Sequence, residues 1–156
     1  FNRDNFGFEY LPDFDENLWH KILSDGARLT RALPELLILG CDVDFLAVSA
    51  ARNNLESLPG GNKVSILHSD FRHHPGLENG TIVCNPPYGI RMGEEKELGK
   101  LYKDFGDFLK QKCKGSQAFV YCGNRELIPS LGLKPAAKIP LVSGNLDGRL
   151  VKLEIY

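Results

Sequence analysis

One stretch of the sequence indicates the fold class of this chain more clearly than any other: Thr81-Ile82-Val83-Cys84-Asn85-Pro86-Pro87-Tyr88-Gly89. Its apolar run, residues 82–84, is typical of a buried parallel strand. The run ends at two prolines, which donate no backbone N–H and disfavour helical angles in the residue before them. We therefore predict a strand followed by a stiff, extended loop. In an open α/β sheet such a loop lies at the carboxyl end of the strand, where ligands bind.

The loop offers the groups that methylation of an exocyclic amine requires. The lone pair of such a nitrogen is delocalised into the ring, so the amine is a poor nucleophile until its hydrogens are held. The Asn85 side-chain oxygen and the Pro86 carbonyl oxygen can accept those hydrogens, and Tyr88 can stack on the base. The alternative is an ordinary proline turn with a surface tyrosine. By average composition, Asn-Pro-Pro-Tyr would arise by chance on the order of once in a thousand such chains or less, which favours a methyltransferase.

The segment Asn85-Pro86-Pro87-Tyr88-Gly89, with Arg91, resembles the target-amine motif of class I S-adenosylmethionine-dependent methyltransferases. From Phe6 to Tyr156 the chain is similar to the THUMP-associated RNA guanine-N2 methyltransferases, and most similar to the bacterial enzymes of large-subunit rRNA. The resemblance implies an α/β, Rossmann-like, three-layer sandwich with a mostly parallel sheet and a C-terminal antiparallel hairpin. It implies S-adenosyl-L-methionine as cofactor and RNA as partner, rRNA before tRNA. It makes Asn85, Pro86, Pro87 and Tyr88 catalytic, and Tyr88 and Arg91 substrate-binding.

Two acidic residues follow predicted strands and are candidates for holding the cofactor. Asp42 comes after the apolar run of residues 36–39, where a carboxylate can accept hydrogen bonds from both ribose hydroxyls. Asp70 comes after the strand predicted at 64–67, where it can accept from an adenine amino group while Phe71 lies against the ring. The alternative for Asp42 is a turn aspartate. The cofactor-binding residues that the resemblance implies are Asp42, Val43, Asp70, Phe71 and Asn85.

The remaining elements follow from periodicity and capping. Asp13 or Asp15 can cap a helix that runs to about Leu29, and Asp44 can cap a helix over residues 45–58. Further on we expect a helix at 98–112, a strand at 118–122, a short helix at 124–131, and a hairpin of strands at 136–142 and 149–156 joined by a turn at 143–148.

Composition excludes several classes of protein. Hydrophobic residues make up 42% of the 156-residue chain and charged residues 25%, as in one ordinary globular domain, and no apolar run approaches membrane-spanning length. The four cysteines are spread singly without a CxxC pair, and His73-His74 has no third ligand at a suitable spacing, so we expect no metal. Cys41, Cys84 and Cys122 lie at apolar strands and are expected to be reduced core thiols of a cytoplasmic protein.

One feature of the resembled family is missing. That family carries a glycine-rich cofactor loop after its first, central strand, and no strand–loop–helix of that kind precedes Asp42. The chain also begins at Phe1, and its one methionine is Met92. We therefore expect residues 1–156 to be a methyltransferase catalytic domain that is incomplete at its N-terminus, with a THUMP-type RNA-binding region upstream. For the same reason we expect these residues alone neither to bind cofactor tightly nor to fold cooperatively.

Two alternatives stay open. The motif loop does not distinguish guanine-N2 from other amine targets, namely a tRNA guanine, a DNA adenine or a protein glutamine. A non-catalytic nucleic-acid-binding fragment is the alternative of a different class; the missing glycine loop favours it, and the intact Asn85-to-Tyr88 segment opposes it. The net charge of −1 indicates that these residues do not supply most of the affinity for RNA. A nicotinamide-dependent dehydrogenase is disfavoured because GxGxxG is lacking.

Overall fold

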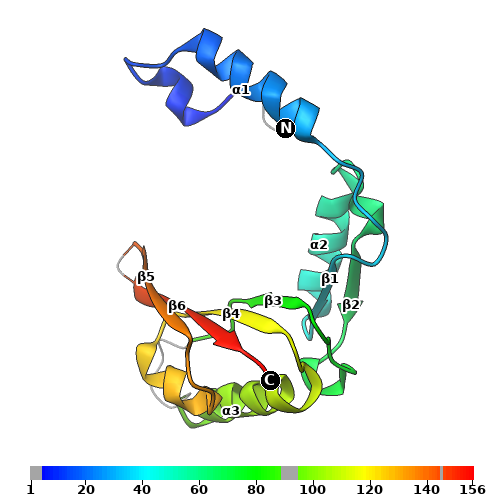
Figure 1. Ribbon diagram of the computed structural model, residues 1–156, viewed down its shortest axis with the longest axis vertical. Helices are drawn as coiled ribbons and strands as arrows, with labels where there is room; N and C mark the ends of the chain where they lie inside the picture. The colour runs from blue at the N-terminus through cyan, green and yellow to red at the C-terminus, as the bar shows by residue number, and fades with distance from the viewer. Residues whose placement is uncertain (1–4, 89–94, 145) are drawn as a thin grey trace. The chain divides into compact units, whose positions relative to one another are not determined.

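The structure is a computed structural model that describes residues 5–88, 95–144 and 146–156. It divides into two compact units, Phe1–Ser69 and Asp70–Tyr156 (Figure 1). Each unit contains one sheet, a two-stranded sheet in the first and a four-stranded sheet in the second. The two units are therefore taken one at a time.

The first unit contains one parallel strand pair, and α2 (Phe45–Glu56) is the helix that packs on it. Its elements are η1 (Gly7–Tyr10), α1 (Glu16–Leu29), β1 (Leu39–Asp42), α2 (Phe45–Glu56), η2 (Gly61–Lys63) and β2 (Ser65–His68). Both predicted caps are confirmed, because Asp15 accepts a hydrogen bond from Leu18 N at 3.0 Å and Asp44 accepts one from Leu46 N at 2.8 Å. Strands β1 and β2 are parallel, with Leu39 opposite Ser65.

The first strand begins later than the apolar run predicted. Residues 36–39 were expected to form it, but β1 begins at Leu39, and Leu36 has a left-handed φ of 59° and is 86% exposed. Strand structure depends on a pairing partner, and the ladder with β2 starts only at Leu39. The unit has a thin core, since Val48 is its one buried hydrophobic side chain among the described residues.

The second unit carries the four-stranded sheet, with order β3-β4-β6-β5. Its elements are η3 (Phe71–His73), β3 (Thr81–Cys84), α3 (Glu95–Lys112), β4 (Gln117–Cys122), η4 (Arg125–Leu131), β5 (Ala137–Ser143) and β6 (Leu146–Glu154). Strand β3 is parallel to β4, whereas β6 is antiparallel to both β4 and β5. The predicted terminal hairpin is confirmed, but its turn is tighter than expected, because Ser143 already pairs with Leu146.

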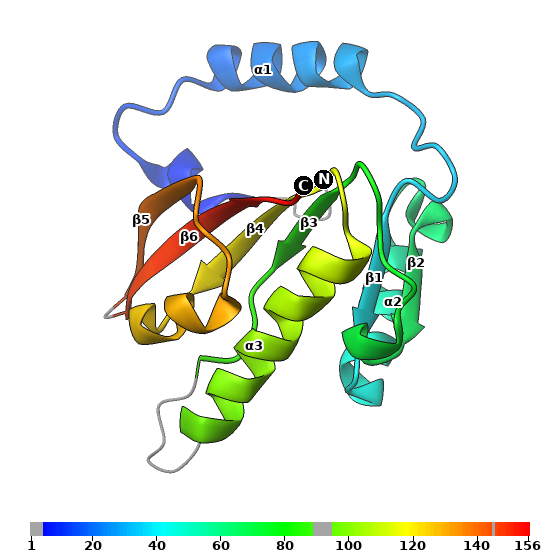
Figure 2. The same cartoon turned by 60° about the horizontal axis from the view of Figure 1, so that its bottom comes forward.

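Helix α3 and the 3-10 helix η4 cover one face of this sheet (Figure 2). Tyr102 and Leu109 of α3 and Leu131 of η4 are at most 1% exposed. They join the inward-facing residues of the central strands, among them Val120 and Val151, in one core cluster. No helix in the described part of the chain is both long and apolar enough to span a lipid bilayer.

Strand β3 is less buried than its apolar sequence predicted. Ile82 and Cys84 are half-buried and pack against the core, but Val83 is 74% exposed. In the four-stranded sheet β3 pairs with β4 alone and is an edge strand, and alternate side chains of a strand point to opposite faces. The parallel direction was predicted correctly, and burial on both faces was not.

The cysteines also differ in burial, and this has a measurable consequence. Cys113 and Cys122 are fully buried and Cys84 is half-buried, whereas Cys41, expected in a core, is exposed because it lies on the thinly covered β1. Burial raises the pKa of the Cys84 thiol to about 12 and that of Cys122 to about 11. Thiolate is the reactive form, so a thiol reagent at pH 8 should modify Cys41 rapidly and the other three only after unfolding.

The measurement is the time course of reaction with Ellman's reagent, with and without denaturant. Cys41→Ser should abolish the fast phase and leave the slow phase unchanged. Two or more fast equivalents in the native protein would contradict this assignment of the thiols.

Candidate functional site

The loop after β3 lies where the sequence placed it, at the carboxyl end of a parallel strand. Asn85 directly follows the last strand residue and is exposed, as is Pro87, whereas Pro86 and Tyr88 are half-buried. Among the described residues no hydrogen bond engages the Asn85 carboxamide. Its side-chain oxygen is therefore available to accept a hydrogen bond from a ligand.

Tyr88 borders a surface depression that we call the Tyr88 hollow. Its volume is about 390 Å³, and it is lined by Tyr88, Gly123, Asn124, Arg125, Glu126, Leu146 and Asp147. The lining comes from three places in the chain: the loop after β3, the segment after β4 and the start of β6. Of the predicted target-amine residues, Tyr88 is the one that lines it. The other lining residues were not identified from the sequence, because no local pattern marks them.

Charged groups of both signs meet at this hollow. The Asp147 carboxylate forms ion pairs with Arg125, at 3.3 Å, and with Arg149. The hydrogen bond from Arg149, followed by the charges of both guanidinium groups, lowers the pKa of Asp147 below its ordinary value. The hollow thus presents hydrogen-bond donors and acceptors next to an aromatic ring, a combination that suits a polar planar ligand.

In the first unit, Asp42 is the last residue of β1, one position earlier relative to the strand than predicted, and Val43 follows it; both are exposed. Asp42 Oδ1 accepts a hydrogen bond from Asp44 N at 2.8 Å, so one carboxylate oxygen closes the turn. The Val43 carbonyl oxygen lies 2.9 Å from His68 Nε2, which ties this turn to the end of β2. Asp42 is therefore both a turn residue and an exposed acceptor.

In the second unit, Asp70 and Phe71 are engaged by other protein groups. The Arg72 guanidinium contacts both oxygens of Asp70, at 2.8–3.1 Å, and lowers the pKa of that carboxyl. The Phe71 ring packs edge-on against Phe105 and Phe108 of α3, at centroid distances of 5.3 and 5.7 Å. A ligand that binds Asp70 would have to share its carboxylate with Arg72.

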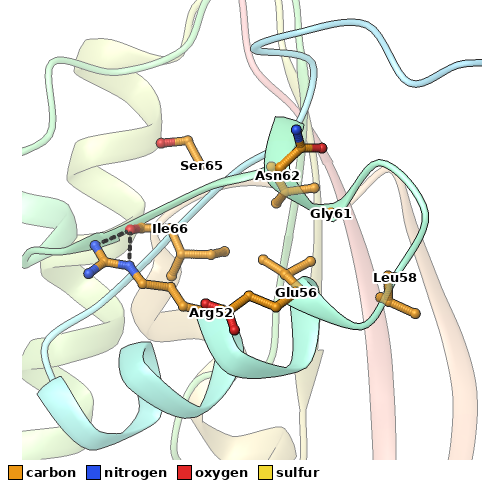
Figure 3. A pocket seen from close by; sticks show the side chains of 9 residues that line it. Arg52, Glu56, Leu58, Gly61, Asn62, Ser65 and Ile66 are labelled. Atoms are coloured by element: carbon orange, nitrogen blue, oxygen red, sulfur yellow. Dashed lines mark hydrogen bonds between the residues drawn. The ribbon is translucent and has the colours of Figure 1, made fainter.

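A depression in the first unit, larger than the Tyr88 hollow, contains none of the predicted site residues. We call it the Arg52 hollow; it measures about 620 Å³ and is lined by Arg52, Leu55, Glu56, Leu58, Gly61, Asn62, Val64, Ser65 and Ile66 (Figure 3). The Arg52 guanidinium donates from Nε and one terminal nitrogen to the Ile66 carbonyl oxygen, at 3.1 and 2.6 Å. This side chain therefore ties α2 to β2.

The candidate site residues thus fall into two groups. Asp42 and Val43 belong to the first unit, and Asp70, Phe71 and the Asn85-to-Tyr88 loop belong to the second. Arg91 lies outside the described residues. Within the second unit, the structure adds the Tyr88 hollow to the loop that the sequence predicted.

Comparison with known proteins gives a consistent result. The model of the family described as "RMKL-like, methyltransferase domain" matches residues 2–152. A candidate RNA methyltransferase of Synechocystis sp., slr0064, is 37% identical over 152 residues, covering 97% of this chain and 40% of that protein. The ribosomal RNA large subunit methyltransferase K/L of Allochromatium vinosum is 34% identical over 161 residues, covering 98% of this chain and 22% of that protein. The crystal structure of SMU.472, a candidate methyltransferase complexed with SAH, matches with a TM-score of 0.81 and 26% identity, covering 99% of this chain and 41% of that one.

The parallel strands with their terminal hairpin, the loop at the end of β3 and the likeness to SMU.472 define the class: this is the Rossmann-like α/β fold of class I methyltransferases, which use S-adenosylmethionine. The predicted Rossmann-like α/β class is thereby confirmed, but two of the four strand pairs in the described residues are parallel and two are antiparallel, so the sheets are mixed and not mostly parallel. The chain belongs to the RMKL-like methyltransferase domain family. It spans 40% of the Synechocystis protein and 22% of the Allochromatium protein.

Proposed function

We propose that this domain transfers a methyl group from S-adenosylmethionine to the exocyclic N2 amine of a guanine in RNA, with large-subunit rRNA as the substrate. The observation that carries the proposal is the position of Asn85-Pro86-Pro87-Tyr88 at the carboxyl end of β3, with Tyr88 lining a hollow. The names of the two relatives support RNA as the substrate class, and the K/L protein supports rRNA. A cytoplasmic location and a THUMP-type RNA-binding region outside this chain complete the proposal.

The chemistry follows from the loop. S-adenosylmethionine supplies an electrophilic methyl group on a sulfonium. With that group bound, the guanine N2 lone pair would form the new N–C bond, the S–C bond would break with its electron pair going to sulfur, and N2 would release one hydrogen as a proton to water. The exposed Asn85 oxygen and the Pro86 carbonyl oxygen hold the two amine hydrogens, which directs the lone pair toward the methyl carbon. Tyr88 stacks on the base. A volume of about 390 Å³ for the Tyr88 hollow falls within the usual range for small-molecule sites.

The donor and acceptor groups of the chain partly fit the cofactor. Asp42 is exposed and uses Oδ1 in the turn with Asp44 N, so its carboxylate can accept hydrogen bonds from ribose hydroxyls. Val43 lies beside it. Asp70 fits less simply, because Arg72 already contacts both its oxygens. We therefore assign the ribose to Asp42 and Val43. We assign the adenine to Asp70 and Phe71, with the Asp70 carboxylate shared between the adenine amino group and Arg72.

The test is analysis of the methylated product. The full-length protein is incubated with labelled cofactor and unmodified rRNA, tRNA or DNA, and the nucleic acid is digested to nucleosides for mass spectrometry. N2-methylguanosine from rRNA is the expected product. Methyl transfer to tRNA guanine or to DNA adenine would replace the substrate assignment, and RNA binding without methyl transfer would support the non-catalytic alternative.

The assignment of Asp42 gives a second prediction. Asp42→Ala should weaken S-adenosylmethionine binding about tenfold or more, since it removes charge-assisted hydrogen bonds of about 1.5–3 kcal/mol. Calorimetry on the full-length protein measures the change. Asp44→Asn is the matched control: it keeps a side-chain acceptor at the N-cap of α2 and should leave the affinity unchanged. Unchanged cofactor affinity in Asp42→Ala, or binding that requires a divalent metal, would overturn the assignment.

A further inference from the structure

Two glycines beside the Tyr88 hollow are not explained by their backbone angles. Gly123 follows β4, and Gly148 lies in β6. Neither belongs to the glycines with positive φ, so both backbones have angles that other residues adopt without strain. A glycine at such a position indicates that another group approaches the backbone closely.

At Gly123 the approaching group is the ring of Tyr88. A Cβ placed on Gly123 would lie 2.6 Å from Tyr88 Cγ and 2.8 Å from both Cδ1 and Cδ2. Its three nearest atoms are thus ring atoms, and two of them are equidistant, so the Cβ would stand above the face of the ring. One face of Tyr88 therefore lies directly on the Cα of Gly123. Any planar ligand that stacks on Tyr88 has to use the opposite face.

A second tyrosine contacts the same ring. Tyr121 meets Tyr88 at a centroid distance of 6.2 Å and an interplanar angle of 87°, an edge-to-face contact. The Tyr121 hydroxyl donates to the Leu141 carbonyl oxygen at 3.4 Å. A Cβ on Gly148 would lie 2.5 Å from Tyr121 Cζ and 2.6 Å from Cε2, so the Tyr121 ring in turn rests on β6.

Strand register explains why these residues meet. Cys84 at the end of β3 lies opposite Val120 of the parallel β4, so the loops that leave both strands emerge at the same edge of the sheet. Cys122 of β4 lies opposite Arg149 of β6, which places Gly148 beside the start of that loop. The sheet thus brings one glycine to each tyrosine ring.

We propose that Gly123 is a positioning residue for the substrate base, because it fixes the plane of the Tyr88 ring and leaves one ring face for a purine to stack on. The proposal rests on the proposed function. A methyl group at residue 123 would displace the ring without removing it, and the base would lose part of its stacking platform. The reacting amine and Asn85 are untouched, so the effect should fall on RNA binding.

Gly123→Ala should therefore raise the KM for RNA about tenfold, within the range for loss of one base–aromatic contact, and change kcat little. Tyr88→Ala should raise KM by a similar factor. In the Tyr88→Ala background Gly123→Ala should have no further effect, since the ring through which it acts is gone. Effects that multiply in the double variant would overturn the proposal. Gly99→Ala is the matched control, because a Cβ there would meet, among the described residues, only Ser130 Oγ at 4.0 Å.

A readout that does not depend on methyl transfer separates this proposal from the proposed function. Fluorotyrosine incorporated at residue 88 should show a shifted ¹⁹F resonance in Gly123→Ala and an unshifted one in Gly99→Ala. If the resonance shifts but the enzyme methylates another substrate, the contact between Gly123 and the Tyr88 ring is supported and the guanine assignment is rejected. An unshifted resonance would overturn the positioning role. If Gly123→Ala fails to fold, the double variant with Tyr88→Ala must restore folding, and failure to restore it would also overturn the proposal.

Discussion

Asn85→Ala should lower kcat about a hundredfold or more while the KM for RNA changes little. The Asn85 carboxamide follows β3 directly and is exposed, so its oxygen can accept from the substrate amine. That hydrogen bond strengthens as N2 pyramidalises and positive charge develops on it. An interaction made mainly in the transition state lowers kcat when it is removed. Single-turnover methyl transfer from labelled cofactor to unmodified rRNA by the full-length protein measures the effect.

Three further variants make this test specific. Asn85→Asp keeps an oxygen acceptor at the same position and should retain more activity than Asn85→Ala. Tyr88→Phe should be mild, because the ring rather than the hydroxyl stacks on the base, whereas Tyr88→Ala should raise the KM for RNA. A wild-type kcat in Asn85→Ala would show that the loop does not position the amine, and the main functional proposal would fail with it.

Gly106→Ala should destabilise the second unit by about 3 kcal/mol, even though alanine is the better helix former. Gly106 lies inside α3 and is buried against η4. A Cβ there would lie 2.7 Å from the carbonyl carbon and 3.0 Å from the Cα of Leu131, and would overlap the carbonyl oxygen. Those atoms belong to backbone at the end of η4 and cannot rotate away. The helix and η4 would have to separate, which opens the core around Leu131.

Gly99→Ala, in the same helix, should change the stability of the unit in the opposite direction. Because a Cβ there meets no close atom among the described residues, this variant should stabilise the unit by about 0.5–1 kcal/mol through helix propensity alone. Hydrogen exchange of the β4 and β6 amides measures the local opening free energy in both variants. Equal protection in Gly106→Ala and Gly99→Ala would show that α3 and η4 do not pack as closely as the structure places them.

Features that depend on neighbouring residues in the chain were predicted well from the sequence. The predicted caps at Asp15 and Asp44 are satisfied within one turn of helix. The loop after β3 follows from Pro86 and Pro87, whose restrictions are covalent. The hairpin follows from alternation, with Val151 and Leu153 buried as a one-sided strand requires.

Burial was predicted less well, because it depends on what covers a strand. Residues 36–38 are apolar but precede the first strand, Val83 is largely exposed on the edge strand β3, and Cys41 is exposed on β1. An apolar run indicates that a segment can be buried. Whether both its faces are covered depends on pairing and packing partners that lie far away in the sequence.

The amino-acid sequence by itself determined the loop that we propose for methyl transfer: Asn85, Pro86, Pro87 and Tyr88 are adjacent in the chain, and the chemistry proposed for them follows from residue type and order. It did not reveal that Arg72 occupies the Asp70 carboxylate, or that Tyr88 rests on Gly123 beside the ion pair of Arg125 and Asp147. Those contacts depend on strand register, in which Cys84 lies opposite Val120 and Cys122 lies opposite Arg149. Register is set by the packing of whole strands in the sheet, and no local pattern in the sequence specifies it.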